Sequence, residues 1–193
     1  YECGLAKPPA DRIRNLIGRS LMQMMQQLAP SAGMGKHEEL VETYAAHYLN
    51  PNNRHMRLFP DVPPTLERLR EAGYWLSVAT GKGRSGLNQA IAQTGTGDFW
   101  LATACASECP SKPAPDMVWR LCDELGVMPS ESIVIGDTAF DLEMAAHAGA
   151  RGIGVTTGAH SRETLQSAPN IGILSCFGEL EGFLQRQGSI EAV

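Results

Sequence analysis

The sequence predicts an α/β fold, in which a parallel sheet carries helices on both faces and a small α-helical unit is attached to it. Residues 1–55 show only helical periodicity, whereas from Pro60 onward short apolar strands alternate with amphipathic helices. This alternation is typical of a parallel sheet covered on both faces, because each crossover helix packs against the sheet. We therefore divide the chain into a helical unit, residues 1–55, and an α/β unit, residues 56–193.

Composition is that of a globular protein and limits the classes of partner. The chain has 193 residues, of which 43% are apolar and 19% charged, so it can form one medium domain with a small accessory domain. A net charge of -5 gives no support to nucleic-acid or anionic-membrane binding. We find no apolar run long enough to span a bilayer and no signal-peptide pattern. The five cysteines have irregular spacing and are interpreted as reduced thiols, so we expect a cytoplasmic location.

Three helices are expected in the helical unit. Asp11 follows Pro8-Pro9 and is a candidate N-cap of the first helix, whose apolar face stops at Gly18. Ser20 can cap the second helix, and "SAGMGK" separates it from the third. The methionines of this unit more commonly pack between helices, although they could line a substrate pocket. Four basic side chains could meet a substrate carboxylate, although solvated helix charges are the commoner role: Arg12, Arg14, Arg19 and Lys36.

Strands and helices alternate through the α/β unit. The expected strands are "YWLSVAT" (74–80), "FWLATA" (99–104), "SIVIGD" (132–137), "GIGVTT" (152–157) and "IGILS" (171–175). Helices are expected over 62–72 and 85–94, from Ala114, directly after "SIVIGD", near 161–167 and near 178–187. In such a sheet, ligands bind at the carboxyl ends of the strands, so the residues at those ends are candidates for function.

Two candidate segments would bind an anion. Thr80 ends the first expected strand, and Gly81 lets the backbone N–H groups of the turn that continues to Lys82 approach a phosphate. "SKPAPD" places Lys112 before a proline-stiffened helix start, where its ammonium could be held beside a phosphate. Each segment taken alone is more often a plain turn or a solvated loop.

The third candidate is a pair of aspartates. Asp137 follows the buried strand "SIVIGD" and is a possible carboxylate ligand of Mg²⁺, a hard cation that takes oxygen ligands and keeps several waters. Asp141 falls in the first turn of the next helix, where its charge also suits the helix dipole. If Asp141 has a functional role, we expect it to support Lys112 or the metal.

In this order, a Thr, a Lys-Pro and a Gly-Asp-x-x-x-Asp resemble motifs two, three and four of the haloacid dehalogenase-like (HAD) phosphatases. The resemblance covers nearly the whole chain. Three segments are similar to the phosphoglycolate phosphatase and β-phosphoglucomutase branch: "LFPDVPPTLERLREAGYWLSVATGK", "SKPAPDMVWRLCDELGV" and "ESIVIGDTAFDLEMAAHAGARGIGVTTG". The resemblance implies a Rossmann-like core over residues 56–193, with residues 1–55 as an α-helical cap that closes over the site and selects the leaving group.

The resemblance also implies a reaction. An Mg²⁺-dependent hydrolase would remove phosphate from a small phosphorylated metabolite, by attack of an aspartate on phosphorus and hydrolysis of the aspartyl-phosphate by water. Thr80 would bind the phosphoryl oxygens together with Gly81 and Lys82, and Lys112 would neutralise the phosphate and the nucleophile. Asp137 would help to hold Mg²⁺.

One motif of this family does not occur in the sequence. No Asp-x-Asp-x-Thr, which supplies the nucleophile, is found, and the chain begins with Tyr1 rather than Met. We therefore expect about thirty upstream residues that carry the first core strand and the nucleophile. That strand should lie between 74–80 and 132–137, because its absence would leave buried N–H and C=O groups on both neighbours without partners. Alone, the chain should be inactive.

Two other functions remain open from the sequence. The first is a non-catalytic protein that keeps the phosphate pocket but binds a ligand or a partner. The second is a phosphosugar mutase, which shares the nucleophile chemistry but needs a further acid/base in the cap. An upstream Asp-x-Asp would favour an enzyme over the non-catalytic protein, and the core motifs do not fix the substrate.

Overall fold

The computed structural model describes residues 3–50 and 56–187, and its paired strands are parallel. They form a two-stranded sheet, β1-β2, and a three-stranded sheet in the order β3-β4-β5. The strands are β1 (Ser77–Thr80), β2 (Ala102–Cys105), β3 (Ile133–Gly136), β4 (Arg151–Val155) and β5 (Gly172–Leu174). The expected parallel strands and intervening helices are confirmed.

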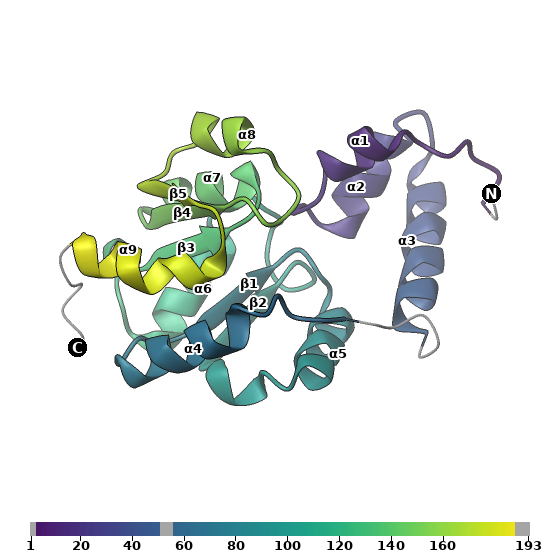
Figure 1. Cartoon of the computed structure of the whole chain (residues 1–193). Coiled ribbons are helices and arrows are strands. Elements are labelled where there is room, and N and C mark those ends of the chain that lie inside the picture. Colours follow the sequence, from purple (N-terminus) through teal and green to yellow (C-terminus); the bar gives the residue numbers. More distant parts are fainter. Residues whose placement is uncertain (1–2, 51–55, 188–193) are drawn as a thin grey trace.

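Helices surround these sheets on two faces, and a further group stands to one side (Figure 1). The group to one side is α1 (Ala10–Arg14), α2 (Leu21–Leu28) and α3 (Met34–Leu49). The others are α4 (Val62–Glu71), α5 (Arg84–Thr94), α6 (Asp116–Leu125), α7 (Ala139–Ala148), α8 (Arg162–Ser167) and α9 (Leu180–Arg186). Short 3₁₀ turns occur at η2 (Gly97–Phe99), η3 (Pro129–Glu131) and η4 (Phe177–Glu179).

The starts of α1 and α2 test two of the sequence predictions. Ser20 is the N-cap of α2, as expected, because its Oγ accepts a hydrogen bond from the Gln23 N–H at 3.3 Å. Asp11 was wrong as the N-cap of α1. Pro9 holds that position with extended backbone, and Asp11 lies in the first turn. Proline has its φ fixed near the helical value, which makes it compatible with a helix start and lets the helix begin two residues earlier.

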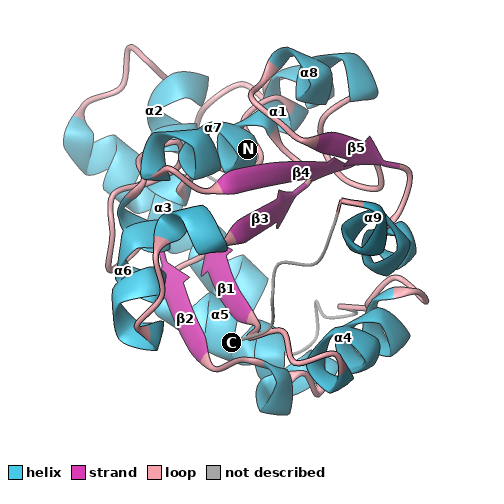
Figure 2. Ribbon diagram, turned by 90° about the vertical axis from the view of Figure 1, so that its left-hand side faces the viewer, coloured by secondary structure: helices cyan, strands magenta, loops and turns pink. Residues whose placement is uncertain are grey.

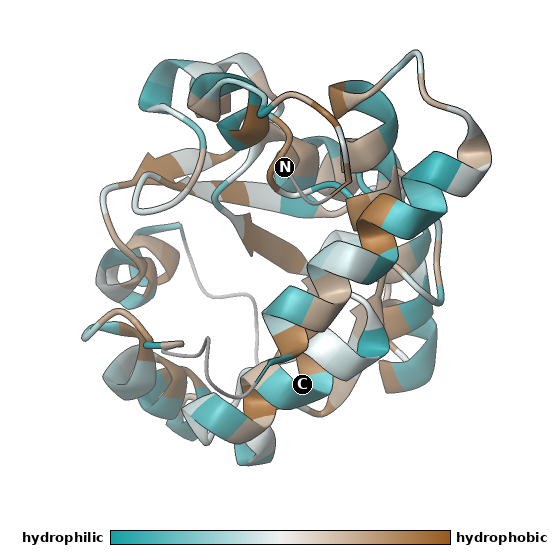
Figure 3. Ribbon diagram, turned by 90° about the vertical axis from the view of Figure 1, so that its right-hand side faces the viewer, coloured by the Kyte–Doolittle hydropathy of each residue, from teal (hydrophilic) through white to brown (hydrophobic). Residues whose placement is uncertain are grey.

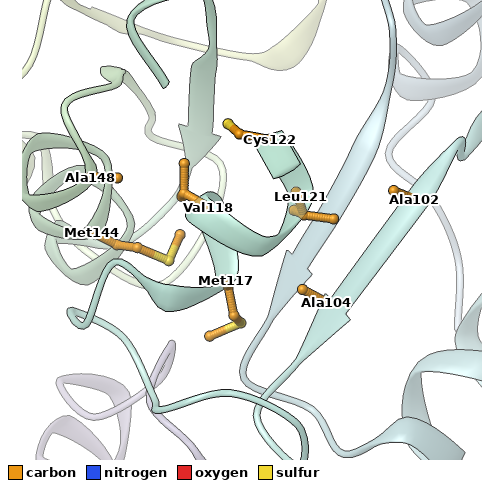
Figure 4. Packing of buried hydrophobic residues seen from close by; sticks show 8 residues of the cluster. All are labelled: Ala102, Ala104, Met117, Val118, Leu121, Cys122, Met144 and Ala148. Atoms are coloured by element: carbon orange, nitrogen blue, oxygen red, sulfur yellow. The ribbon is translucent and has the colours of Figure 1, made fainter. Parts of the chain in front are cut away.

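One face of the sheets is covered by α6 and α7, and the core on this face is shown in Figure 4. Its side chains come from β2, α6 and α7, and they are Ala102, Ala104, Met117, Val118, Leu121, Cys122, Met144 and Ala148. The small alanines of β2 let α6 approach the sheet closely, and the methionines fill the space that remains. The apolar positions of α6 recur at helical spacing, which is why one stripe of this helix is buried.

The opposite face is covered by α4 and α9. Ile153 and Val155 of β4 point to this face, because alternate residues of a strand share a face. They pack there with Leu69, Leu174, Leu180 and Leu184. Gly152 lies on the α7 side, where an added Cβ would be only 3.1 Å from Leu142 Cδ2. Glycine and β-branched residues therefore alternate in this strand because Gly152 faces the closely packed helix α7, whereas Ile153 and Val155 face the apolar layer on the other side.

The two sheets are separated by a cavity. Among the described residues, β1 pairs only with β2 and β3 pairs only with β4, so each has one edge without a neighbour (Figure 2). A cavity of about 390 Å³ lies between these edges, lined mainly by apolar residues of β1, β3, α4, α6 and α9. Ala79 and Asp141 also line it. The cavity therefore extends to the carboxyl ends of β1 and β3.

No helix in the described part of the chain combines the length and the apolar character needed to cross a membrane. The helix α3 has 16 residues, and Figure 3, which views the molecule from the side of α1–α3, shows hydrophilic and hydrophobic residues interspersed along it. The five cysteines are free thiols.

Candidate active site

The residues singled out in the sequence lie at or just beyond the ends of strands. Thr80 is the last residue of β1, Asp137 directly follows β3, and Asp141 is in the first turn of α7. Lys112 lies in the segment between β2 and α6. Figure 2 shows β1 and β3 running in the same general direction, so that their carboxyl ends lie on one side of the molecule.

A buried ion pair joins two of these segments. Lys112 Nζ donates to Asp141 Oδ1 at 2.6 Å and to the carbonyl oxygen of Ala79 at 2.9 Å. Each side chain of the pair is only 7% exposed. An ammonium has three N–H donors, and two are used here. The third is available to an oxygen of a bound anion.

Asp141 is held in place by the start of α7. Its Oδ2 accepts hydrogen bonds from the N–H of Thr138 at 3.2 Å and from Thr138 Oγ1 at 2.6 Å, which forms a capping box. The carboxylate also lies against the end of β3, because a Cβ added to Gly136 would be 2.2 Å from Asp141 Cβ. Its second oxygen is thus occupied by the helix start, and its first oxygen is directed to Lys112.

Asp137 is fixed by a different loop. Its Oδ2 accepts a hydrogen bond from the Ala159 N–H at 2.9 Å, and its carbonyl oxygen accepts one from the His160 N–H at 3.2 Å. Gly158 lets this loop approach, since a Cβ there would lie 2.0 Å from Asp137 Oδ2. Among the described residues, no donor bonds the other carboxylate oxygen, Oδ1.

This donor set fits Mg²⁺ in part. A half-buried carboxylate with one free oxygen is a suitable single ligand for an ion that keeps most of its waters. Within residues 3–50 and 56–187, however, no three His, Cys, Asp or Glu side chains form a metal-binding group. Asp137 is therefore one ligand of a site that needs further oxygens.

Thr80 and Lys82 are placed differently from one another. Thr80 Oγ1 accepts a hydrogen bond from the Lys82 N–H at 3.2 Å, which closes the turn after β1 around Gly81. The Lys82 side chain leaves this turn: its Nζ donates to the Tyr48 hydroxyl at 2.6 Å and lies 4.6 Å from the centre of the Tyr48 ring. The structure thus directs this ammonium to α3 rather than to Lys112 and Asp141.

A charged network supports the segment between β2 and Lys112. Arg84 Nε donates to Glu108 Oε1 at 2.6 Å, and Arg120 Nη1 donates to Glu108 Oε2 at 2.9 Å. The hydrogen bond from Arg84 is the main reason that the pKa of Glu108 lies at about 2, well below its ordinary value. Arg84 also donates to Thr103 Oγ1 at 2.8 Å, which ties β2 to the start of α5.

The sequence did not indicate two contacts near the site, those of Ser111 and Arg19. Ser111 Oγ accepts a hydrogen bond from the Ser20 N–H at 2.7 Å, and the guanidinium of Arg19 lies 4.2 Å from the centre of the Phe140 ring. Arg19 is therefore not a solvated helix charge. In the sequence, Gly18 indicated where the first helix stops, and in the structure its φ is 105°. No sequence pattern indicates what the residues after Gly18 contact.

Similarity to known proteins agrees with this geometry. Residues 1–155 match the family model of the haloacid dehalogenase-like hydrolases. A phosphoglycolate phosphatase from Mannheimia succiniciproducens is 29% identical over 144 residues, which cover 74% of this chain and 64% of that protein. A pyrophosphatase, PpaX, from Bacillus velezensis is 29% identical over 133 residues, which cover 68% and 62% of the two chains. The present chain thus spans slightly less than two thirds of the length of these two relatives.

Solved structures show the same fold. A haloacid dehalogenase-like hydrolase from Bacteroides fragilis is 26% identical and superposes with a TM-score of 0.82, covering 93% of this chain and 86% of that chain. The match of more than half of the chain to the family model, together with these relatives, establishes the family. The chain belongs to the haloacid dehalogenase-like hydrolases, in their phosphoglycolate phosphatase-like branch.

Proposed function

We propose that this protein is an Mg²⁺-dependent phosphatase that acts on a small phosphorylated metabolite through an aspartyl-phosphate. The observation that carries the proposal is the buried Lys112, whose ammonium donates to Asp141 and to the carbonyl oxygen of Ala79, two residues that line the cavity between the sheets. Its third N–H donor has no acceptor among the described residues. A cation held in this way neutralises charge on a transferring phosphoryl group without moving during the reaction. The relatives' names, phosphoglycolate phosphatase and pyrophosphatase, are consistent with this class of substrate.

The nucleophile would come from a strand that fills the cavity. β1 and β3 each offer a row of backbone N–H and C=O groups on the edge that faces the cavity, and such groups are costly when buried without partners. A strand inserted between them would end near Ala79 and Asp141, which line the cavity. An aspartate that followed this strand would lie next to Lys112. We place the family's first motif there, in a segment additional to the residues in this sequence.

The reaction then divides into two displacements. A carboxylate oxygen of the nucleophile attacks phosphorus, the bond from phosphorus to the ester oxygen breaks, and that oxygen takes a proton from water and leaves as an alcohol. Water next attacks the aspartyl-phosphate, which releases inorganic phosphate and restores the carboxylate. Both steps concentrate negative charge on the phosphoryl oxygens, so positioning and charge neutralisation supply most of the acceleration.

The residues of this chain would have distinct parts in this scheme. Lys112 would neutralise the phosphoryl group and the nucleophile, and Thr80 with the backbone of Gly81 would bind phosphoryl oxygens. Asp141 would orient Lys112. Asp137 would be one ligand of Mg²⁺, which when bound would withdraw charge from the phosphoryl oxygens. Lys82 would contribute only after its ammonium left Tyr48.

We also propose that residues 1–55 form the cap of this enzyme and residues 56–193 its core. The position of α1–α3 to one side of the sheets supports this division (Figure 1). The contact between Ser20 and Ser111 joins the two parts next to Lys112.

The first prediction concerns metal-dependent turnover. The protein expressed from its complete reading frame should hydrolyse an aryl phosphate with Mg²⁺, and EDTA should abolish this activity. Asp137→Asn should lower kcat/KM at least about 100-fold, because a metal ligand would lose its charge. Asp123→Asn, which removes an exposed carboxylate from α6, is the matched control and should stay within about twofold.

Two results would contradict the proposal. The first is turnover by the complete protein that persists in EDTA or in Asp137→Asn. The second is Mg²⁺-dependent turnover by the chain Tyr1–Val193 alone, because the nucleophile would then be a residue other than the one proposed.

A further inference from the structure

The loop between β4 and α8, residues 156–161, closes around Asp137. The Ala159 N–H donates to Asp137 Oδ2 at 2.9 Å, and the His160 N–H donates to the Asp137 carbonyl oxygen at 3.2 Å. A Cβ on Gly158 would lie 2.0 Å from Asp137 Oδ2, so only a glycine lets the loop pass this closely. The orientation of the Asp137 carboxylate therefore depends on where this loop lies.

His160 anchors the loop to the core. It is the one buried residue within 156–161, with 8% of its surface exposed. Its Nδ1 accepts a hydrogen bond from the Ala139 N–H at 3.0 Å. Ala139 is the first residue of α7, where backbone N–H groups have no partner within the helix. The imidazole ring thus joins the loop that holds Asp137 to the helix start that holds Asp141.

The two nitrogens of the His160 ring are used unequally. Because Nδ1 accepts a hydrogen bond, the neutral ring carries its hydrogen on Nε2. Nε2 is buried without a partner among the described residues, and the Phe140 ring meets the imidazole edge-on with ring centres 5.4 Å apart. A buried donor without an acceptor is costly, which offsets stability gained from the bond at Nδ1. The ring should therefore matter more for the position of the loop than for the stability of the fold.

We infer that His160 is a positioning residue for Asp137 as a ligand of Mg²⁺. The ring holds the loop against α7, and the Ala159 N–H then fixes the plane of the Asp137 carboxylate. Mg²⁺ demands near-octahedral geometry, so a carboxylate that can rotate binds it less well. The effect on metal binding rests on the proposed role of Asp137 in the phosphatase, whereas the order of the loop can be measured without metal or turnover.

The second prediction compares side chains that replace one ring nitrogen or the other. The oxygen of an asparagine lies near the place of Nδ1, whereas the amide of a glutamine reaches the place of Nε2. With the protein from the complete reading frame, His160→Gln and His160→Leu should raise the Mg²⁺ concentration for half-maximal turnover of an aryl phosphate by about 10-fold or more. His160→Asn, which keeps the acceptor, should stay within about threefold. Saturating Mg²⁺ should restore most of the turnover, because metal affinity rather than the chemical step is impaired.

Two further measurements do not depend on catalysis. Mn²⁺ takes the same oxygen ligands as Mg²⁺, and its binding, followed by the EPR signal of the free ion, should weaken about 10-fold in His160→Gln and His160→Leu. In both variants the Ala159 amide, which donates to Asp137, should exchange with solvent at least about 10-fold faster by NMR. His160→Asn should restore both quantities. Gln166→Ala, at an exposed site of α8, is the matched control and should change neither.

Two results would overturn the role of His160. The first is recovery of metal affinity in His160→Gln but not in His160→Asn, because Nε2 would then be the functional atom. The second is unchanged Mn²⁺ binding and Ala159 exchange in His160→Gln and His160→Leu, whatever the turnover. If His160→Leu does not fold, His160→Gln alone supplies the comparison with His160→Asn. Absence of Mg²⁺-dependent turnover in the complete protein, with Mn²⁺ binding and Ala159 exchange that still require the Nδ1 acceptor, would refute the phosphatase and keep the positioning role.

Discussion

Lys112 and Asp141 show at the scale of single residues how the site depends on the fold. Both side chains are 7% exposed, and the bond between them joins the segment before α6 to the start of α7. Desolvation makes a buried pair a weak source of net stability, but removal of one partner leaves the other charge uncompensated. The pair is therefore more important for the position of the ammonium than for the stability of the core.

The third prediction follows from that asymmetry. Asp141→Leu should lower the free energy of unfolding by about 3–5 kcal/mol, because Lys112 would remain buried without a counterion. The double variant Lys112→Met/Asp141→Leu should be more stable than Asp141→Leu alone. Urea unfolding measures both. Glu143→Leu, two residues along α7 and only partly buried, is the control and should change stability by about 0.5 kcal/mol or less. A double variant no more stable than the single one would show that the charge of Lys112 is not the cause.

Some residues of the site could be predicted from the sequence, and others could not. Lys112 and Asp137 were found because polar residues that directly follow a buried strand, or precede a helix, stand out against their neighbours. Arg19 was named with three other basic residues as a possible contact of a substrate carboxylate. Its stacking on Phe140 could not be predicted, because Phe140 is 121 positions away in the chain and only the fold brings the two together. The turn of Lys82 toward Tyr48 was missed for the same reason.

At the scale of helices and strands, the boundaries of the elements could be predicted only in part from the sequence. The strand expected over 74–80 is paired only at Ser77–Thr80, although Tyr74 and Leu76 pack in the core. Apolar alternation reports burial, whereas strand pairing depends on the partner, and β2 begins only at Ala102. The order and type of the elements in the α/β unit followed from periodicity, and α6, for example, buries the stripe that its apolar residues predict. The helices α1 and α2 bury no residue.

The fourth prediction concerns the junction of β3 and α7. Gly136→Ala should lower the free energy of unfolding by at least about 1–3 kcal/mol, because the new Cβ would overlap Asp141 Cβ, 2.2 Å away, and force the helix start to move. The same shift should separate Asp141 from Lys112 and reduce any phosphatase activity. Gly35→Ala in α3, where nothing lies within 4 Å, should be neutral or stabilising by up to about 1 kcal/mol. Thermal unfolding measures the stability of both variants. Equal losses of stability in the two variants would contradict this explanation.

At the scale of the whole molecule, the two sheets depend on what lies between them. The apolar cavity of about 390 Å³ separates β1 from β3, and both strands expose backbone groups toward it. Unpaired edges of this kind are unfavourable when buried and invite pairing with another chain when exposed. The two core clusters lie on opposite faces of the sheets, and among the described residues no strand joins β1 to β3 across the cavity. We therefore expect the α/β unit to gain much of its rigidity from the segment that occupies the cavity.

The fifth prediction tests that segment by hydrogen exchange. In the chain Tyr1–Val193, backbone amides of β1 and β3 should exchange much faster than those of β4, because β4 has neighbours on both edges and the other two have one each. In the protein from the complete reading frame, an inserted strand should slow exchange in β1 and β3 by at least about 100-fold, while β4 should change less. The exchange rates of the backbone amides distinguish the two possibilities, because they depend on whether the edges of β1 and β3 are paired and do not depend on the nucleophile. Equal exchange of β1, β3 and β4 in both proteins would show that the cavity is not the seat of a strand, and the placement of the nucleophile beside Lys112 would then lose its structural basis.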